Sequence, residues 1–193
     1  MANVPLTVTV WVALLPGAPT VQEKPVRLRF DVQHMPATPD GKPRPLEPKE
    51  IRAFEAEVKG LPGVKEATCS ESSVTITVDP DGRLRLSDLR AAGKKTLGTE
   101  AGKPVIVFNT VKLEGRVSIT LHVEKNPEKV KEALKGFGEA LAESGETHDL
   151  KVKSPVPVLT VVKAVAARCG VEYKVFDILK DIVWHGTSKG PEK

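Results

Sequence analysis

Alternating apolar and polar residues near the start of the chain predict a β-strand with one buried face. The apolar members of this alternation are Val26, Leu28, Phe30 and Val32. A period of two places these side chains on the same side of a strand. Five prolines occur from Met35 to Pro48, and a stretch so rich in proline is typical of an extended loop. The sequence therefore predicts a strand that leads into a proline-rich loop.

A change of period after this loop predicts a helix. Apolar residues now recur at spacings of three and four, at Ile51, Phe54, Val58 and Leu61. This spacing forms a single apolar stripe along a helix. Pro48 suits the first helical position, where its missing N–H loses no partner. Gly60 and Gly63 are expected to end the helix.

Shorter patterns complete a first unit. Two strands joined by a polar turn are predicted at 64–69 and 74–78, on the basis of their apolar alternation. A helix capped by Ser87 and ending at Gly93 is expected next, and 105–108 supplies a last strand. The order is βαββαβ, in which the crossovers place both helices on one face of an antiparallel sheet.

The second half of the chain repeats part of this plan. Residues 117–123 alternate as a strand. Asn126 is expected to cap a helix that has Pro127 at its first position. The apolar stripe predicted for this helix consists of Val130, Leu134, Phe137 and Leu141.

Three further segments follow that helix. Leu150 and Val152 indicate a strand. A second helical stripe, closed by Gly170, contains Val158, Val162, Val165 and Cys169. Residues 171–184 fit a strand and a helix equally well.

These patterns predict an α+β fold of two tandem ferredoxin-like βαββαβ sandwiches, the second incomplete or divergent. The first domain is expected at 26–109 and the second αβ domain at 115–185, and the polar tail 186–193 is expected to be disordered. The chain has 193 residues, and typical domains of ~100–150 residues leave room for two small ones.

Residues 1–25 contain an apolar segment with two interpretations. Val4–Leu15 is almost wholly apolar, as in a signal peptide, yet no Lys or Arg precedes it. The segment also alternates as an extra strand would. A signal peptide implies an exported or periplasmic protein, and otherwise a cytoplasmic location is expected. The segment is shorter than the ~20 residues of a membrane-spanning helix, so no integral membrane segment is predicted.

Charge and composition argue against a nucleic-acid partner. The formal net charge is +4, but Lys and Glu alternate closely, as in 124–132, and aromatic residues make up only 4% of the chain. Nucleic-acid binders usually concentrate their basic residues on one patch and use aromatic side chains to stack on bases. A nucleic-acid partner is therefore not expected. The expected partner is a protein, as the first hypothesis below states. The sequence does not indicate an oligomeric state.

The first unit resembles the heavy-metal-associated domain family, which is found in copper chaperones and metal-pumping ATPases. The residues that carry the resemblance are His34-Met35, the helical stripe beginning at Ile51, and the segments 60–64, 74–78 and 86–93. The resemblance covers Val26–Asn109 and implies a ferredoxin-like fold. In that family a Met at the end of the first strand is followed by a Cys-x-x-Cys loop that binds Cu(I) or another soft ion.

The metal site implied by this resemblance has no counterpart here. Met35 is followed by Pro36-Ala37-Thr38-Pro39, so no residue matches either cysteine. The remaining candidate ligands for copper or zinc are His34 and Cys69, because both are expected near one end of the sheet. Packing is the stronger explanation for Cys69, since it follows Ala67 on the predicted buried face.

The other cysteine and the remaining histidines carry no predicted chemistry. Cys169 lies on an apolar helical stripe and is expected in the core. The two cysteines are far apart in the sequence and form no Cys-x-x-Cys motif, which fits a reducing compartment. His122 is expected to face solvent. His148 and His185 have no partner at a ligand spacing.

Three hypotheses about function follow, in order of preference. The first is a non-enzymatic protein-interaction or structural module whose sheet face and proline-rich loop contact another protein. The second is a protein that binds copper or zinc through His34, Cys69 or other ligands. The third is an enzyme with an unrecognised site, although no catalytic or cofactor-binding residue is predicted.

Overall fold

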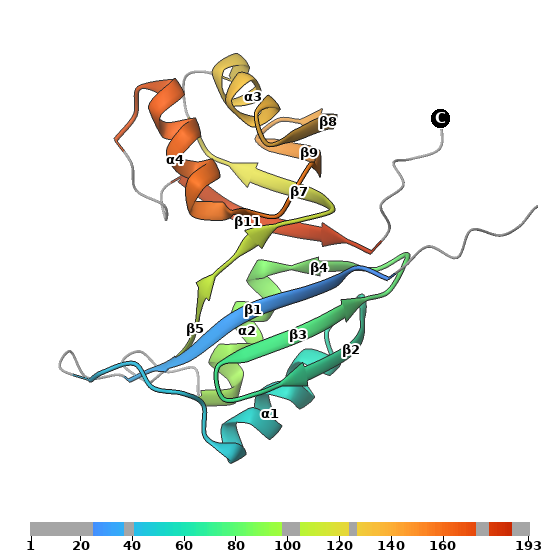
Figure 1. Cartoon of the computed structure of the whole chain (residues 1–193), viewed down its shortest axis with the longest axis vertical. Coiled ribbons are helices and arrows are strands. Elements are labelled where there is room, and N and C mark those ends of the chain that lie inside the picture. Colours follow the sequence, from blue (N-terminus) through green and yellow to red (C-terminus); the bar gives the residue numbers. More distant parts are fainter. Residues whose placement is uncertain (1–24, 37–40, 98–104, 124–126, 173–177, 187–193) are drawn as a thin grey trace, which may run out of the picture.

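The computed structural model describes residues 25–36, 41–97, 105–123, 127–172 and 178–186. Over these residues the fold is α+β, with four α-helices packed on antiparallel sheets (Figure 1). Most of the N-terminal apolar segment and of the polar tail lies outside the described residues. None of the described helices has the length and apolar character that a membrane crossing requires.

The first half forms a four-stranded antiparallel sheet with two helices. Its elements are β1 (Arg27–Met35), α1 (Pro48–Lys59), β2 (Val64–Cys69), β3 (Ser73–Val78), α2 (Leu86–Leu97) and β5 (Val105–Thr110). The strand order is β2-β3-β1-β5. The strands predicted from alternation are confirmed, because alternate residues of β1 and β3 are buried.

Helix α1 begins and ends near the predicted residues. Pro48 is its first residue, and the backbone N–H of Glu47 just before it donates to Glu50. Phe54 and Val58 of the predicted stripe are buried beneath the helix. Gly60 caps the C-terminal end, as expected.

The prediction for α2 was wrong at both ends. The helix begins at Leu86, and Ser87 does not cap it, because the N–H and hydroxyl of Ser87 donate to Asp181, far along the chain. The helix also continues through Gly93 to Leu97. A Cβ at Gly93 would lie 3.2 Å from Cβ of Ile106, so this glycine serves close packing of α2 on β5 rather than helix termination.

A short strand that the sequence did not predict joins the two halves. Strand β4 (Arg83–Arg85) lies between β3 and α2 in the chain but pairs with β11 (Leu179–His185) of the second sheet. Leu84 is opposite Trp184 and fully buried. Three residues are too few for a period of two to be recognised.

The second half forms a five-stranded antiparallel sheet, which includes β4 and β11. Its other elements are β7 (Arg116–Leu121), α3 (Pro127–Lys135), β8 (Gly138–Ser144), β9 (Thr147–Val152) and α4 (Val158–Cys169). The strand order is β4-β11-β7-β9-β8. The short strands β6 (Lys112–Leu113) and β10 (Val156–Pro157) pair with each other.

The second half differs from the prediction at the end of α3 and in strand β8, and the short strands β6 and β10 were not predicted either. Helix α3 starts at Pro127 as expected but ends at Lys135, so Phe137 and Leu141 are not helical and Leu141 lies on β8. At Gly138 a Cβ would be 2.7 Å from the carbonyl oxygen of Lys151, so the chain turns here into close pairing with β9. The predicted cap Asn126 lies outside the described residues.

The last described segments confirm one expectation and show which of two alternatives holds in another. Gly170 caps α4 in the left-handed conformation, with φ of 67°, which glycine adopts without steric cost. Within the ambiguous segment 171–184, residues from Leu179 onward form strand β11, while 173–177 are outside the described residues.

One hydrophobic core runs through both halves. The ring of Trp184 on β11 meets that of Phe30 on β1 edge to face, with centroids 5.2 Å apart. The indole N–H of Trp184 also donates to the carbonyl of Lys112 at 3.2 Å. The two sheets are therefore joined by a shared core as well as by β4 (Figure 1).

Candidate functional site

His34, one of the two candidate metal ligands, makes a polar contact with helix α1. It is buried near the end of β1, and its Nδ1 lies 2.8 Å from Oε1 of Glu50. Arg44 donates two further hydrogen bonds to the same carboxylate, at 2.8 and 2.9 Å. Burial acts to raise the pKa of Glu50, but the hydrogen bonds from Arg44, the Glu47 backbone and His34 outweigh it and lower the pKa to about 2.

Cys69, the other candidate ligand, has a different partner. Its backbone N–H donates to Oε2 of Glu55 at 2.9 Å, and its side chain is buried, as predicted. Burial and the nearby charge of Glu55 raise the pKa of the Cys69 thiol to about 11. This raised pKa favours the protonated thiol, whereas the thiolate is the form that binds metal ions.

The two candidate ligands contact different glutamates of helix α1, His34 through Glu50 and Cys69 through Glu55. Among the described residues, no group of three or more His, Cys, Asp and Glu side chains is arranged to hold a metal ion. Binding of copper or zinc through His34 or Cys69 stays a prediction. Zinc titration of the wild type and of the His34→Ala and Cys69→Ala variants tests it, and binding unaffected by both substitutions contradicts it.

The proline-rich loop is attached to the sheet in the part that the structure describes. Arg44 exchanges two backbone hydrogen bonds with His34, and the N–H of Leu46 donates to the carbonyl of Glu71 at 2.7 Å. Leu46 is buried in the core. Residues 41–47 therefore stabilise the end of the sheet, which limits their use as a free contact surface.

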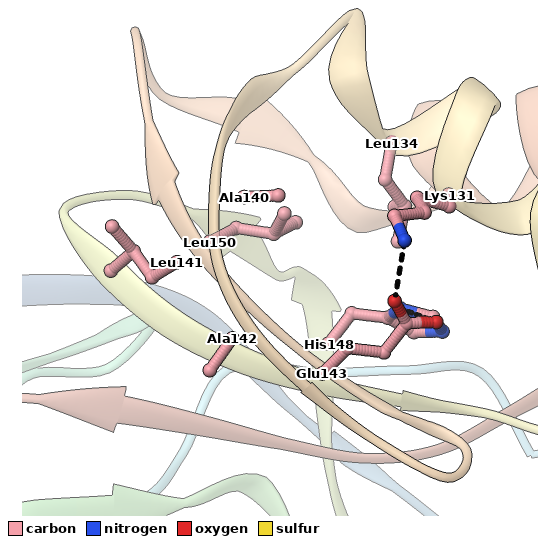
Figure 2. A pocket seen from close by; sticks show the side chains of 8 residues that line it. All are labelled: Lys131, Leu134, Ala140, Leu141, Ala142, Glu143, His148 and Leu150. Carbon is pink, nitrogen blue, oxygen red and sulfur yellow. Dashed lines mark ion pairs between the residues drawn. The ribbon is translucent and has the colours of Figure 1, made fainter.

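The most promising site is a pocket between α3 and the β8–β9 hairpin (Figure 2). It has a volume of about 270 Å³. Its lining comes from three consecutive elements: Lys131 and Leu134 of α3, Ala140, Leu141, Ala142 and Glu143 of β8, and His148 and Leu150 of β9.

One side of the pocket carries three charged or titratable side chains. Glu143 lies between the other two, with Oε2 3.1 Å from Nζ of Lys131 and Oε1 3.7 Å from Nδ1 of His148. Burial lowers the pKa of His148, with Glu143 acting in the opposite direction. The hydrogen bond from Lys131 to Glu143 raises the pKa of the lysine. At neutral pH the site thus holds a Lys–Glu ion pair beside a neutral imidazole.

The other side of the pocket is aliphatic. Leu134 and Leu150 are buried, whereas Ala140 and Ala142 are exposed. Successive strand residues normally point to opposite faces. Here the β8–β9 register shifts between Ala140 and Ala142, and such a bulge redirects side chains. The bulge places Ala140 and Glu143, three residues apart, on the face that carries Leu150 and His148 of β9. Ala142 is opposite Asp149, so its side chain faces the other way.

Sequence reasoning missed this site because it depends on β8. Glu143 and Leu141 were not expected on a strand, and His148 was given no role, although it is opposite Ile119 and shares its buried face. The signal that was available is Gly145, which has φ of 59° in the turn between β8 and β9. A glycine in this conformation is typical of a tight hairpin.

The remaining histidines have ordinary polar partners. His122, expected to face solvent, is partly exposed and pairs with Glu146. Nε2 of His185 lies 2.7 Å from Oγ of Ser118. Cys169 is buried, as predicted.

Comparison with known proteins adds no family or relative to these observations. No protein-family model, curated protein or solved structure matched the chain. The resemblance of 26–109 to the heavy-metal-associated family therefore depends only on residues of this sequence, such as His34-Met35 and the helical stripe beginning at Ile51.

Proposed function

We propose that the protein is a non-enzymatic interaction module of two fused ferredoxin-like units that binds an extended segment of a partner protein along β8. The observation that carries this proposal is that four consecutive residues of an edge strand, Ala140 to Glu143, line the pocket. Anything that enters the pocket consequently lies beside the free edge of β8.

The strand orders support two ferredoxin-like units. Each half has the element order βαββαβ once β4, β6 and β10 are set aside. The sheet orders β2-β3-β1-β5 and β8-β9-β7-β11 are the same when strands are numbered within each half. In both, the first and third strands are central and the second and fourth are outer.

The free edge of β8 supports binding of an extended segment. Among the described residues β8 pairs only with β9, so backbone N–H and C=O groups on its other side are available. A segment that adds to a sheet edge gains affinity from main-chain hydrogen bonds and specificity from side-chain pockets. The pocket of about 270 Å³ is slightly below the ~300–1,000 Å³ of small-molecule sites, which suits a single aliphatic side chain.

The polar groups of the pocket are better suited to binding than to catalysis. A nucleophilic lysine needs a lowered pKa, whereas the pKa of Lys131 is raised by its contact with Glu143. The same ion pair leaves Glu143 as a hydrogen-bond acceptor for a polar group of the partner. These properties support the non-enzymatic part of the proposal.

A peptide-display experiment tests the proposal. A library of random decapeptides is selected on the full-length chain, and the affinities of recovered peptides are measured by fluorescence polarisation. The Ala140→Trp variant fills the pocket from the exposed edge strand, because Ala140 is directly opposite Leu150 and shares its face. An aromatic residue is compatible with β-structure at this position. The matched control is Ala91→Trp, because Ala91 is also exposed but lies on α2, outside the pocket.

The proposal gives a different expectation for each variant. Ala140→Trp is expected to weaken peptide binding by about tenfold or more, equivalent to at least ~1.4 kcal/mol. Ala91→Trp is expected to leave the affinity unchanged. Recovery of no binding peptide, or equal affinities for the two variants, would contradict the proposal.

A further inference from the structure

A second cavity lies where the two halves of the molecule meet, away from the β8 pocket. Its volume is about 180 Å³. It is lined by the turn Pro80, Asp81, Gly82 and Arg83, and by Arg116, His185 and Gly186. Three sheet strands contribute to this lining, since Arg83 begins β4, Arg116 begins β7 and His185 ends β11.

The basic side chains of this cavity form a row across neighbouring strands. His185 is directly opposite Arg83. Trp184 is opposite Val117, so His185 and Arg116 occupy the next position along the same two strands. Arg116 is in turn opposite Lys151 on β9. Lys151 does not line the cavity, but Arg83 and Arg116 do, and they lie on either side of His185 in this row. An anion bound between these two guanidinium groups would relieve their mutual repulsion.

Charged groups of both signs surround His185. Burial is the main cause of the lowered pKa of His185. The charges of Arg116 and Arg83 lower this pKa further, while Asp149 acts in the opposite direction. Asp149 lies 3.9 Å from Arg116, and Asp81 also lines the cavity. The acidic groups therefore offset part of the positive charge, which suits a small anion better than a polyanion.

The wall of the cavity is held by close backbone packing. The N–H of Gly186 donates to the carbonyl of Gly82 at 3.0 Å, and the N–H of Gly82 donates to that of Asp79 at 2.8 Å. A Cβ at Gly186 would lie only 1.6 Å from the carbonyl oxygen of Asp79. Only glycine fits there, so the turn and the end of β11 form a fixed frame for the side chains.

We propose that this cavity binds a small phosphate-type oxyanion through Arg83 and Arg116, with His185 beside it. A guanidinium group presents paired N–H donors that match the oxygens of phosphate. The cavity has room for such an ion with several water molecules, which take ~30 Å³ each in the liquid. This site is independent of the β8 pocket, and either can exist without the other.

Titration with inorganic phosphate tests this site in the full-length chain at constant ionic strength. The readout is the change in amide chemical shifts of Gly82, Arg83 and Gly186 in NMR spectra. Arg83→Gln removes one guanidinium from an exposed position. Arg116→Lys retains the charge but removes the paired donors. Arg85→Gln is the matched control, because Arg85 is an exposed arginine on the same strand that does not line the cavity.

The expected result is saturable binding with a dissociation constant on the order of 1 mM or tighter. Arg83→Gln and Arg116→Lys should weaken it by about tenfold, the loss expected for a charge-assisted contact. Arg85→Gln should change it less than about twofold. Sulfate should compete with phosphate, and acetate should bind more weakly.

Three results would overturn the proposal. The first is the absence of saturable shifts at the cavity amides. The second is an equal loss of affinity in Arg83→Gln and Arg85→Gln, which would indicate general attraction to a basic surface. The third is acetate binding as tight as that of phosphate, which would indicate a carboxylate site.

Discussion

Glu50 connects the proline-rich loop, strand β1 and helix α1 through one carboxylate. It accepts hydrogen bonds from Arg44 and the Glu47 backbone and lies against His34, and its side chain is only 14% exposed. A carboxylate with a lowered pKa stabilises the folded state while it is ionised. Because of this contact, the free energy of unfolding depends on pH in the acidic range.

This contact predicts how stability changes in acid. The pKa of Glu50 falls from 4.5 to about 2 on folding, so its contribution is complete above about pH 4.5 and is lost as the pH falls toward 2. Glu50→Gln should reduce the unfolding free energy at pH 7 by about 1–3 kcal/mol. In the same variant the unfolding free energy, measured by urea unfolding, should depend less on pH between these limits.

Glu71→Gln is the control for this experiment, because the Glu71 side chain is exposed and its backbone carbonyl accepts a hydrogen bond from Leu46 of the same loop. It should change the unfolding free energy by less than about 0.5 kcal/mol. An equal effect of the two substitutions, or an unchanged acid profile in Glu50→Gln, would mean that this carboxylate does not stabilise the loop.

At the scale of elements, the sequence predicted long periodic segments well and short ones badly. Strands β1, β3 and β7 and helices α1 and α4 follow from apolar spacing, because each buries one regular face. Strand β4 was missed because three residues show no period. Strand β8 was missed because its edge position and bulge leave most of it exposed, and Leu141 continued the helical spacing of α3 by coincidence.

The same reason limited prediction of the candidate sites. The β8 pocket depends on the register that places His148 and Glu143 beside α3. The basic row depends on the pairing of β4 with β11. Register between segments distant in sequence is set by tertiary packing, which the local pattern does not contain.

Gly136, which follows α3, and Gly138, which begins β8, give a test at this scale. Gly138→Ala should destabilise the protein by about 1–3 kcal/mol, because its Cβ would meet the backbone of β9 and force a shift. Gly136→Ala should be tolerated, since its Cβ would lie 3.5 Å from the nearest backbone oxygen. Thermal unfolding of both variants measures the difference, and equal melting temperatures would argue against the close β8–β9 pairing at Gly138.

At the scale of the whole molecule, the two halves form one unit. Strand β4 carries the first half into the second sheet, Ser87 of α2 bonds to Asp181, and Trp184 packs on Phe30. These contacts cross the boundary between the segments 26–109 and 115–185. A shared core predicts that the halves lose structure together.

Trp184→Ala tests this coupling. The substitution should cost about 3–5 kcal/mol, because it leaves a large cavity in the core. Native-state hydrogen exchange should show the loss at both Ile76 in the first sheet and Ile119 in the second. Trp184→Phe retains an aromatic ring and should cost less. A loss confined to the second sheet would show that the halves are independent.

Binding of an extended segment at the free edge of β8 is tested most directly by hydrogen–deuterium exchange of the full-length chain, with and without a selected peptide. We expect the peptide to slow exchange at the amides of β8, because an added strand would bond to those that now face solvent. Unchanged exchange along β8, with protection elsewhere in the molecule, would contradict the central claim.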